Sequence, residues 1–431
     1  MKGLLLSLLM VAGGPWSLSD CIQYALEHNI SVQQSQITVE QRDIDLNTAQ
    51  GRRLPGVSAG SSQNFSFGRG LTADNTYANT NTTNTSFTLG AEIPVFQGLQ
   101  ISNSITLSKL NLAAATADLE KARDDIRVAV AQAYVQILYD KEILSVANNQ
   151  ILIDEQQVER LEAMAANGKA SKAEVAAQKA TLAQSKLTAT QAENSLKMSI
   201  LDLTQLLELP SPDGFDIAVV DARNLEPGLL MNPEDIYAEA VSVKPVVKSE
   251  ELRLDYAETN IKLAKGGFYP SLSISGGLGS NFYTSSGFDY KPFGEQIRNN
   301  FSQYIGISLN IPVFSRFSVR NDVRSAQLNF KNQQLQLENV KKSLYKEIQQ
   351  AYFSAVASQS KLEGSIEAAA SAQESFTLVS AKYENGKANI TEFNEAKDRL
   401  LEAESNLAQA RYEHLYQSKL LDFYQGKDLV F

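Results

Sequence analysis

Few side chains in this sequence have the types and spacing that catalysis or metal binding requires. Its 431 residues include one cysteine, Cys21, and two histidines, His28 and His414. One cysteine can form neither an internal disulfide nor a cluster of thiolate ligands, and two histidines argue against an imidazole-rich metal site. The sequence contains no recognisable set of nucleophile, base and acid. It therefore predicts a protein without enzymatic activity, cofactor or structural metal.

Three acidic residues stand where they could begin a helix or form a charged site. Ser171-x-x-Glu174 and Asn389-x-x-Glu392 have the pattern of helix N-caps that are followed by an acid at the third position. Glu395 lies beyond the capping turn, on the same helical face as Glu392. Helix capping can therefore explain the positions of Glu174 and Glu392, whereas the position of Glu395 indicates another role.

The net charge and the N-terminus restrict the class of partner and the compartment. A net charge of −10 and a pI near 5.0 argue against nucleic acid as a partner, because nucleic-acid binders present a basic face. Met1 to Ala12 combine one lysine with an apolar run that is too short to span a bilayer as a helix. This pattern predicts a secretory signal peptide.

Sequence signals recur at one spacing, which predicts an internal tandem duplication. Asn-Gly-Lys-Ala occurs at 167–170 and again at 385–388, and Pro94 has its counterpart in Pro312; both pairs are 218 residues apart. We expect a signal peptide at 1–14, N-terminal helices of the first repeat at 15–54, a β-hairpin at 55–97, long and short helices at 98–209, a linker at 210–232, helices of the second repeat at 233–269, a second hairpin at 270–314, long and short helices at 315–424 and a tail at 425–431.

Apolar residues recur every seven positions through two long stretches without proline. A strict seven-residue repeat implies a left-handed supercoil against a neighbouring helix. A helix from about 98 to 167 would be roughly 100 Å long at 1.5 Å per residue. The two seams are Val130, Ile137, Leu144, Ile151, Val158 and Ala165, and Ile348, Ala355, Leu362, Ala369, Phe376 and Tyr383.

Four stretches alternate apolar and polar residues, as in "SFTLGAEIPVF" at 86–96 and "YIGISLNIPVF" at 304–314. We expect four strands of roughly ten residues, the length of transmembrane β-strands, with polar loops at 68–84 and 283–300. Pro94 and Pro312 should end strands and turn the chain into its long helices. Four strands cannot close a barrel, so copies must join; two would give eight strands, and three would give twelve and room for a passage. A soluble sandwich sheet is the alternative.

The duplication, "IPVF" before each long helix, the paired hairpins and the glycine breaks together resemble the TolC-like outer-membrane efflux protein family. The resemblance implies a mainly α fold with a transmembrane β part: a homotrimer whose twelve-stranded barrel in outer-membrane lipid continues as a long α-helical coiled-coil barrel across the periplasm. It implies a passive exit duct for small molecules, metal ions or polypeptides. The duct would dock to a periplasmic adapter (membrane fusion) protein and an energised inner-membrane transporter of RND, ABC or MFS type.

The same resemblance assigns roles to residues near the two Asn-Gly sites. Glu392 and Glu395 fall on the family's pore-gate acidic ring, while Glu174 and Tyr383 fall on its tip latch. The arginine of that latch falls on Ala388, so the neighbouring Lys387 is the candidate substitute. The expected contacts with the adapter are Asn167, Gly168, Lys169, Asn385, Gly386 and Lys387. A trimeric coiled-coil stalk or scaffold, or a periplasmic adapter without a channel, remains the alternative function.

Overall fold

The computed structural model describes residues 14–71, 74–220, 230–286 and 288–430. Residues 1–13 of the expected signal peptide and 221–229 of the expected linker therefore lie outside the described residues. The chain divides into two compact units. Unit 1 comprises the described residues of Met1–Ile37, Thr116–Lys248 and Glu338–Phe431, and unit 2 comprises those of Thr38–Ala115 and Ser249–Leu337.

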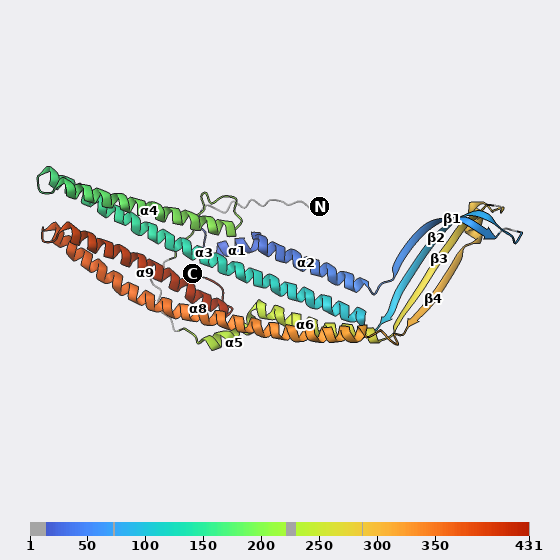
Figure 1. Cartoon of the computed structure of the whole chain (residues 1–431). Coiled ribbons are helices and arrows are strands. Elements are labelled where there is room, and N and C mark those ends of the chain that lie inside the picture. The colour runs from blue at the N-terminus through green and yellow to red at the C-terminus, as the bar shows by residue number, and fades with distance from the viewer. Residues whose placement is uncertain (1–13, 72–73, 221–229, 287, 431) are drawn as a thin grey trace. The chain divides into compact units, whose positions relative to one another are not determined.

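The elements follow one another as two helices, a hairpin and two helices, and this order then recurs (Figure 1). In chain order they are α1 Leu18–His28, α2 Ile30–Gly51, β1 Gly56–Leu71, β2 Tyr77–Gln97, α3 Gln100–Ala166, α4 Lys172–Leu206, α5 Pro233–Val243, α6 Pro245–Lys265, the 3₁₀ helix η2 Gly266–Phe268, β3 Ser271–Ser285, α7 Phe293–Asn299, β4 Ser302–Asn310, α8 Ser318–Glu384 and α9 Ile390–Tyr424.

Corresponding helices of the two halves have equal lengths. Both α3 and α8 have 67 residues, and both α4 and α9 have 35. Each long helix begins after two residues with left-handed backbone, Gly98 and Leu99 before α3, and Arg316 and Phe317 before α8. At Gly98 a side chain would also meet the carbonyl oxygen of Gly266, so this turn requires glycine. The long helices predicted from the heptads are confirmed.

Heptad positions contribute buried side chains to unit 1. Val130, Ile137, Ile348 and Ala355 are fully buried, as the seven-residue spacing predicts. Cys21 packs in the same core as Val130 and Ile137, and burial raises the pKa of its thiol to about 12. This cysteine is therefore a packed apolar side chain rather than a reactive thiol.

Unit 2 contains one antiparallel sheet in the order β1-β2-β3-β4. Ile93, Ile274 and Ile307 stand directly opposite one another on β2, β3 and β4, so one face of the sheet is apolar, as the alternation predicts. The strands have 16, 21, 15 and 9 residues, and the expected length of about ten was wrong for the first three.

The first hairpin extends through the segment that we expected to be a loop. β1 and β2 pair from Gly56 with Glu92 to Leu71 with Tyr77. Asn has a low strand propensity, and the side chains of both Asn and Thr are polar. Pairing with a long neighbouring strand satisfies their backbone groups and outweighs this local preference. The expected loop at 68–84 is therefore wrong.

Pro94 does not end its strand. β2 continues to Gln97, with an irregularity in its pairing to β3 between Pro94 and Phe96. Pairing with β1 has already ended at Glu92, so the missing N–H of Pro94 can lie on a side without a partner strand. Pro312, by contrast, lies after the end of β4 at Asn310.

The short helix α7 covers the edge of β3 beyond the end of β4. The buried side-chain amide of Gln296 accepts a hydrogen bond from the N–H of Tyr283 and donates one to its carbonyl oxygen, both at 3.0 Å. Gln296 thereby imitates the backbone of a missing strand residue. The expected loop at 283–300 thus contains the end of β3 and this helix.

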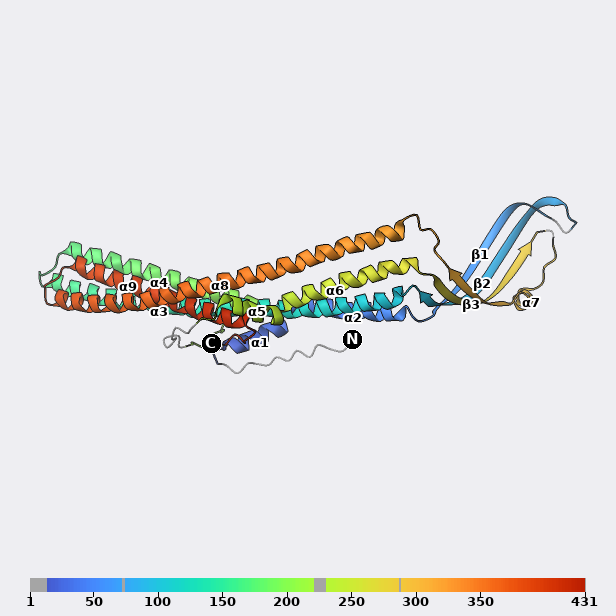
Figure 2. The ribbon, with the colours of Figure 1, turned by 90° about the horizontal axis from the view of Figure 1, so that it is seen from below.

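Four helical segments of unit 2 run side by side next to the sheet. Figure 1 shows α3 between α2 and α8, and Figure 2 shows α6 between α3 and α8. α2 leads into β1 and α8 follows β4, so the outer helices are connected to the outer strands. Among the described residues, no helix has both the length and the apolar character that crossing a membrane requires.

Candidate functional site

The two helical tips have the same backbone geometry. α3 ends at Ala166, after which Gly168 has a φ of +69°, and α8 ends at Glu384, after which Gly386 has a φ of +70°. The N–H of Lys169 bonds the carbonyl of Met164 at 2.8 Å, and that of Gly168 bonds Ala165 at 3.0 Å. These are the hydrogen bonds of a Schellman motif, which needs a left-handed residue and hence favours glycine.

Asn167 and Asn385 close the last turn of their helices. The side-chain amide of each donates to the carbonyl four residues earlier, at 2.8 Å to Ala163 and 2.7 Å to Ala381. Lys169 and Lys387 are exposed beside these turns. Both tips thus expose a glycine backbone and a lysine ammonium.

Glu174 and Glu392 each complete a capping box. The Ser171 hydroxyl accepts from the N–H of Glu174 at 3.1 Å, and the Glu174 carboxylate accepts from the N–H of Ser171 at 2.6 Å. This backbone hydrogen bond, followed by that of the Ser171 side chain, lowers the pKa of Glu174. Asn389 and Glu392 make the equivalent pair at 2.9 and 3.3 Å. The capping alternative is therefore realised at both helix starts.

Glu395 has no capping role. It is exposed on α9, and its carboxylate lies 3.9 Å from the guanidinium of Arg399, which is also exposed. Solvent screening makes such a pair weak. The Glu395 carboxylate therefore remains available to an ion.

Tyr383 joins α8 to α3. Its hydroxyl accepts from the side-chain amide of Gln157 at 2.5 Å, and the Arg160 guanidinium carbon lies 4.8 Å from the centre of its ring. Burial raises the pKa of Tyr383, while the Gln157 hydrogen bond acts in the opposite direction. Among the described residues, no hydrogen bond or ion pair connects Tyr383 to Glu174 or Lys387, but the Glu174 charge lies near enough to Tyr383 to raise the pKa of its hydroxyl.

A buried ion pair that the sequence reasoning missed lies near the tips. The Lys397 ammonium on α9 is 2.6 Å from Asp154 Oδ1 on α3, and their side chains are 1% and 0% exposed. The Asp154 carboxylate also accepts hydrogen bonds from Gln150 at 3.2 Å, Gln178 at 3.1 Å and Ser185 at 2.6 Å. This one carboxylate therefore links α3, α4 and α9.

A signal for this pair was present in the heptads. Asp154 interrupts the seam between Ile151 and Val158, and Lys397 stands between Phe393 and Leu400. A charged residue within an apolar seam must find a partner or leave the interface. The sequence did not indicate which of its many opposite charges would be that partner.

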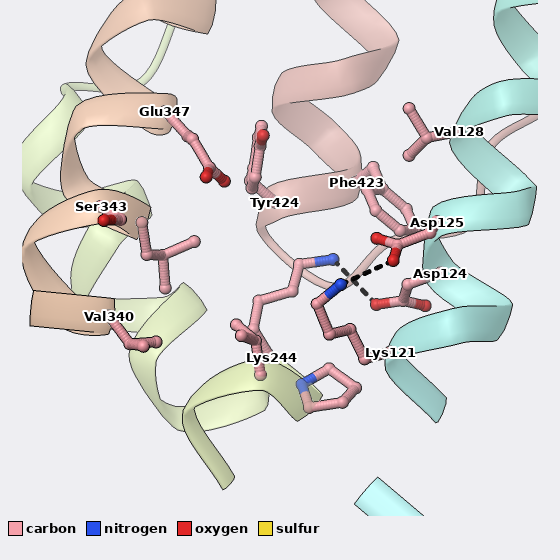
Figure 3. Close-up of a pocket in the computed structure, with 13 residues that line it drawn as sticks. Lys121, Asp124, Asp125, Val128, Lys244, Val340, Ser343, Glu347, Phe423 and Tyr424 are labelled. Atoms are coloured by element: carbon pink, nitrogen blue, oxygen red, sulfur yellow. Dashed lines mark hydrogen bonds and ion pairs between the residues drawn. The ribbon is translucent and has the colours of Figure 1, made fainter. Parts of the chain in front are cut away.

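A second charged cluster in unit 1 surrounds a cavity of about 370 Å³ where α5 meets α6 (Figure 3). The Lys244 ammonium points into it, 3.4 Å from Asp124 Oδ2 and 3.4 Å from the centre of the Phe423 ring. Burial lowers the pKa of Lys244, and the Asp124 charge acts in the opposite direction. The Lys244 ammonium already contacts both the Asp124 carboxylate and the Phe423 ring. We therefore interpret this cluster as a structural contact between α3, α9 and the α5–α6 junction.

A model of the outer membrane efflux protein family matches residues 21–208 and 236–427. This chain belongs to the outer membrane efflux protein family. It is an outer-membrane protein that extends into the periplasm, as the resemblance implies.

Relatives with the name outer membrane protein TolC match about half of the chain or less. That of Escherichia coli K12 is 26% identical over 227 residues, which are 52% of this chain and 45% of the relative. That of Vibrio cholerae is 25% identical over 225 residues, which are 52% of this chain and 50% of the relative. The chain thus spans about half the length of the curated relatives it matches.

Solved structures resemble nearly the whole chain. The outer membrane protein VceC of Vibrio cholerae matches with a TM-score of 0.77 and 18% identity over 96% of both chains. The CmeC outer membrane channel of Campylobacter jejuni matches with a TM-score of 0.78 and 18% identity over 96% of this chain and 87% of its own. This likeness shows the fold, and the predicted class, mainly α with a transmembrane β part, is confirmed.

Proposed function

We propose that the protein is a passive exit duct through the outer membrane, formed by three copies of the chain. The observation that carries this proposal is the open sheet: among the described residues, β1 pairs only with β2, and β4 only with β3. In lipid, each unpaired backbone group costs several kcal/mol, so a β-structure must close on itself. Four strands are too few, whereas three copies supply twelve and leave room for a passage.

The duct would continue through the long helices into the periplasm. An energised inner-membrane transporter of RND, ABC or MFS type would supply the cargo, and a periplasmic adapter would join the two. We assign the adapter contact to the helical tips, because both present the same turn and a lysine. Its residues are Asn167, Gly168, Lys169, Asn385, Gly386 and Lys387.

We propose a gate at the tip of α9. Glu392 and Glu395 are both exposed on one helical face, and three copies would bring six carboxylates near the axis. Such a ring attracts cations and resists anions. Contacts of Glu174, Tyr383 and Lys387 would hold the closed state until the adapter docks. The duct needs no enzymatic activity and no cofactor.

Single-channel conductance in planar bilayers tests this function. The native protein should form small, cation-selective openings that divalent cations block from the periplasmic side. In Glu392→Gln/Glu395→Gln the block should weaken at least tenfold in cation concentration. Glu363→Gln/Glu367→Gln is the matched control, because it removes the same charge from exposed positions on α8; its block should be unchanged.

Two results would contradict the proposal. A native protein that forms no openings and stays in solution without detergent would favour the periplasmic adapter or scaffold. If both double variants lose the divalent block equally, pore formation stands but the acidic gate is in the wrong place.

A further inference from the structure

The short helix α7 is fixed beside the end of β3 that is far from the junction with α6 (Figure 2). The side-chain amide of Gln296 bonds both the N–H and the carbonyl oxygen of Tyr283. The side-chain amide of Asn300, which caps the end of α7, donates to the carbonyl oxygen of Asn281 at 2.8 Å. α7 therefore stands at the level of residues 281–283.

These three hydrogen bonds satisfy backbone groups that have no partner strand. The pairing of β4 with β3 reaches only to Gly279, so among the described residues no strand lies beside the next part of that edge. In water, solvent molecules would bond such groups, whereas lipid would leave them unsatisfied. Their replacement partners on α7 and its cap therefore indicate a place from which water is largely excluded.

An aromatic cluster joins α7 to the apolar face of the sheet. Phe87 is six residues from Ile93 on β2, and Phe282 is eight residues from Ile274 on β3, so both rings lie on the apolar face. The Phe293 ring of α7 contacts both, with centroids 6.3 Å from Phe87 and 5.2 Å from Phe282. These edge-to-face contacts make α7 a continuation of the apolar face.

The outer surface of this cluster is exposed. Phe293 is 50% exposed, and Tyr290, whose ring centroid lies 6.3 Å from that of Phe282, is 61% exposed. A phenyl ring can contact acyl chains, while a phenol hydroxyl can bond headgroups and water. Aromatic side chains of this kind are typical of the boundary between a membrane and water.

The level of α7 agrees with the thickness of a membrane. At the other end of the sheet, Phe96 on β2 stands opposite Leu272 on β3 and is 39% exposed. Phe282 lies ten residues beyond Leu272 on β3. This separation is about 33 Å along the strand, or about 25 Å along the axis of a barrel whose strands tilt by about 40°. The apolar band of transmembrane barrels is about as tall, and aromatic residues border it on both sides.

We propose that α7 is an interfacial anchor whose Phe293 and Tyr290 lie in the headgroup region of the outer leaflet and hold the sheet at that depth. The helices extend into the periplasm, so the far end of β3 belongs to the outer leaflet. The partner is lipid rather than an adapter protein, because the exposed rings continue the apolar face that contacts acyl chains. This inference needs the outer-membrane location, and it does not depend on the proposed trimer or gate.

Quenching of tryptophan fluorescence by brominated lipids tests the depth of α7. The chain has one tryptophan, Trp16, so each variant is made in a Trp16→Phe background and reconstituted in liposomes. The emission of Phe293→Trp should fall about twofold with lipids that carry bromine near the headgroup, and less with lipids that carry it near the end of the acyl chain. Leu278→Trp, four residues before Phe282 on the same face of β3, should show the opposite order.

Two further variants complete the test. Phe353→Trp is the matched control, because Phe353 is 65% exposed on α8 in unit 1, and neither lipid should quench it. Tyr290→Trp repeats the measurement at a second position of the cluster, so that misfolding of one variant does not decide the result.

The outcomes separate this inference from the proposed duct. If Leu278→Trp is quenched and neither Phe293→Trp nor Tyr290→Trp is, α7 stands in water and the anchor is wrong, while the duct remains. Quenching of Phe293→Trp with the depth preference of Leu278→Trp would place α7 in the hydrocarbon core and would also contradict the anchor. If no variant is quenched, the sheet does not enter lipid, and the duct fails as well.

Discussion

Replacing Lys397 by methionine should loosen the helices near the tips. The change leaves the Asp154 carboxylate without its counter-ion at a position that is 0% exposed. Removing one partner of a buried ion pair costs roughly 3–5 kcal/mol. Asp154 would keep hydrogen bonds from Gln150, Gln178 and Ser185, so we expect the lower end of that range, about 3 kcal/mol.

Native-state hydrogen exchange of the backbone amides around Asp154 and Lys397 measures this loss. A cost of about 3 kcal/mol corresponds to exchange roughly 100-fold faster, since 1.36 kcal/mol is a factor of ten. Arg399→Met is the matched control on the same helix. Arg399 is 76% exposed, and its guanidinium pairs only with the exposed Glu395 carboxylate, at 3.9 Å, among the described residues. Removing it should therefore change the exchange rate by about twofold at most.

The reverse change should cost more. In Asp154→Asn the Lys397 ammonium would keep, among the described residues, only the exposed Asp398 carboxylate at 3.8 Å as an ionic neighbour. The double variant Asp154→Asn/Lys397→Met should lose less than the two single losses together, because neither charge is then left alone. If Lys397→Met and Arg399→Met change exchange within threefold of each other, the pair does not carry the stability assigned to it.

The remaining predictions concern pH and two glycine turns, one at a helical tip and one between a strand and a helix. Burial lowers the pKa of His414 below its ordinary 6.5, with Glu363 acting in the opposite direction. The contribution of the neutral His414 side chain to the stability of the folded protein should therefore be present above pH 6.5 and lost as the pH falls below 6.5. Between pH 7 and 5 the Tm of the native protein should fall more steeply than that of His414→Gln, and parallel curves would contradict this. Gly168→Ala should cost about 1 kcal/mol from its left-handed backbone. Gly98→Ala should cost more, because its added methyl group would also meet Gly266; equal losses in thermal unfolding would refute the contact.

Local periodicity was enough to predict the helices. Heptads predicted a helix from about 98 to 167, and α3 runs from Gln100 to Ala166. A helix satisfies its own backbone hydrogen bonds, so its extent depends on nearby residues. The strands were predicted less well, because a strand extends as far as its neighbour does. That is why the Asn- and Thr-rich segment belongs to a hairpin and why β2 passes through Pro94.

The residues near the tips also fall into two groups, those whose partners are near in the sequence and those whose partners are distant. The capping boxes at Glu174 and Glu392 involve partners three residues apart, so the sequence alone could predict them. Tyr383 with Gln157, and Lys397 with Asp154, join residues 226 and 243 positions apart. The sequence by itself thus determined the helices, their caps, the left-handed glycine turns and the apolar strand face, all of which follow from neighbouring residues. Only the tertiary structure decided which charges meet in the core and which apolar side chains stay exposed, because those outcomes depend on how distant segments pack.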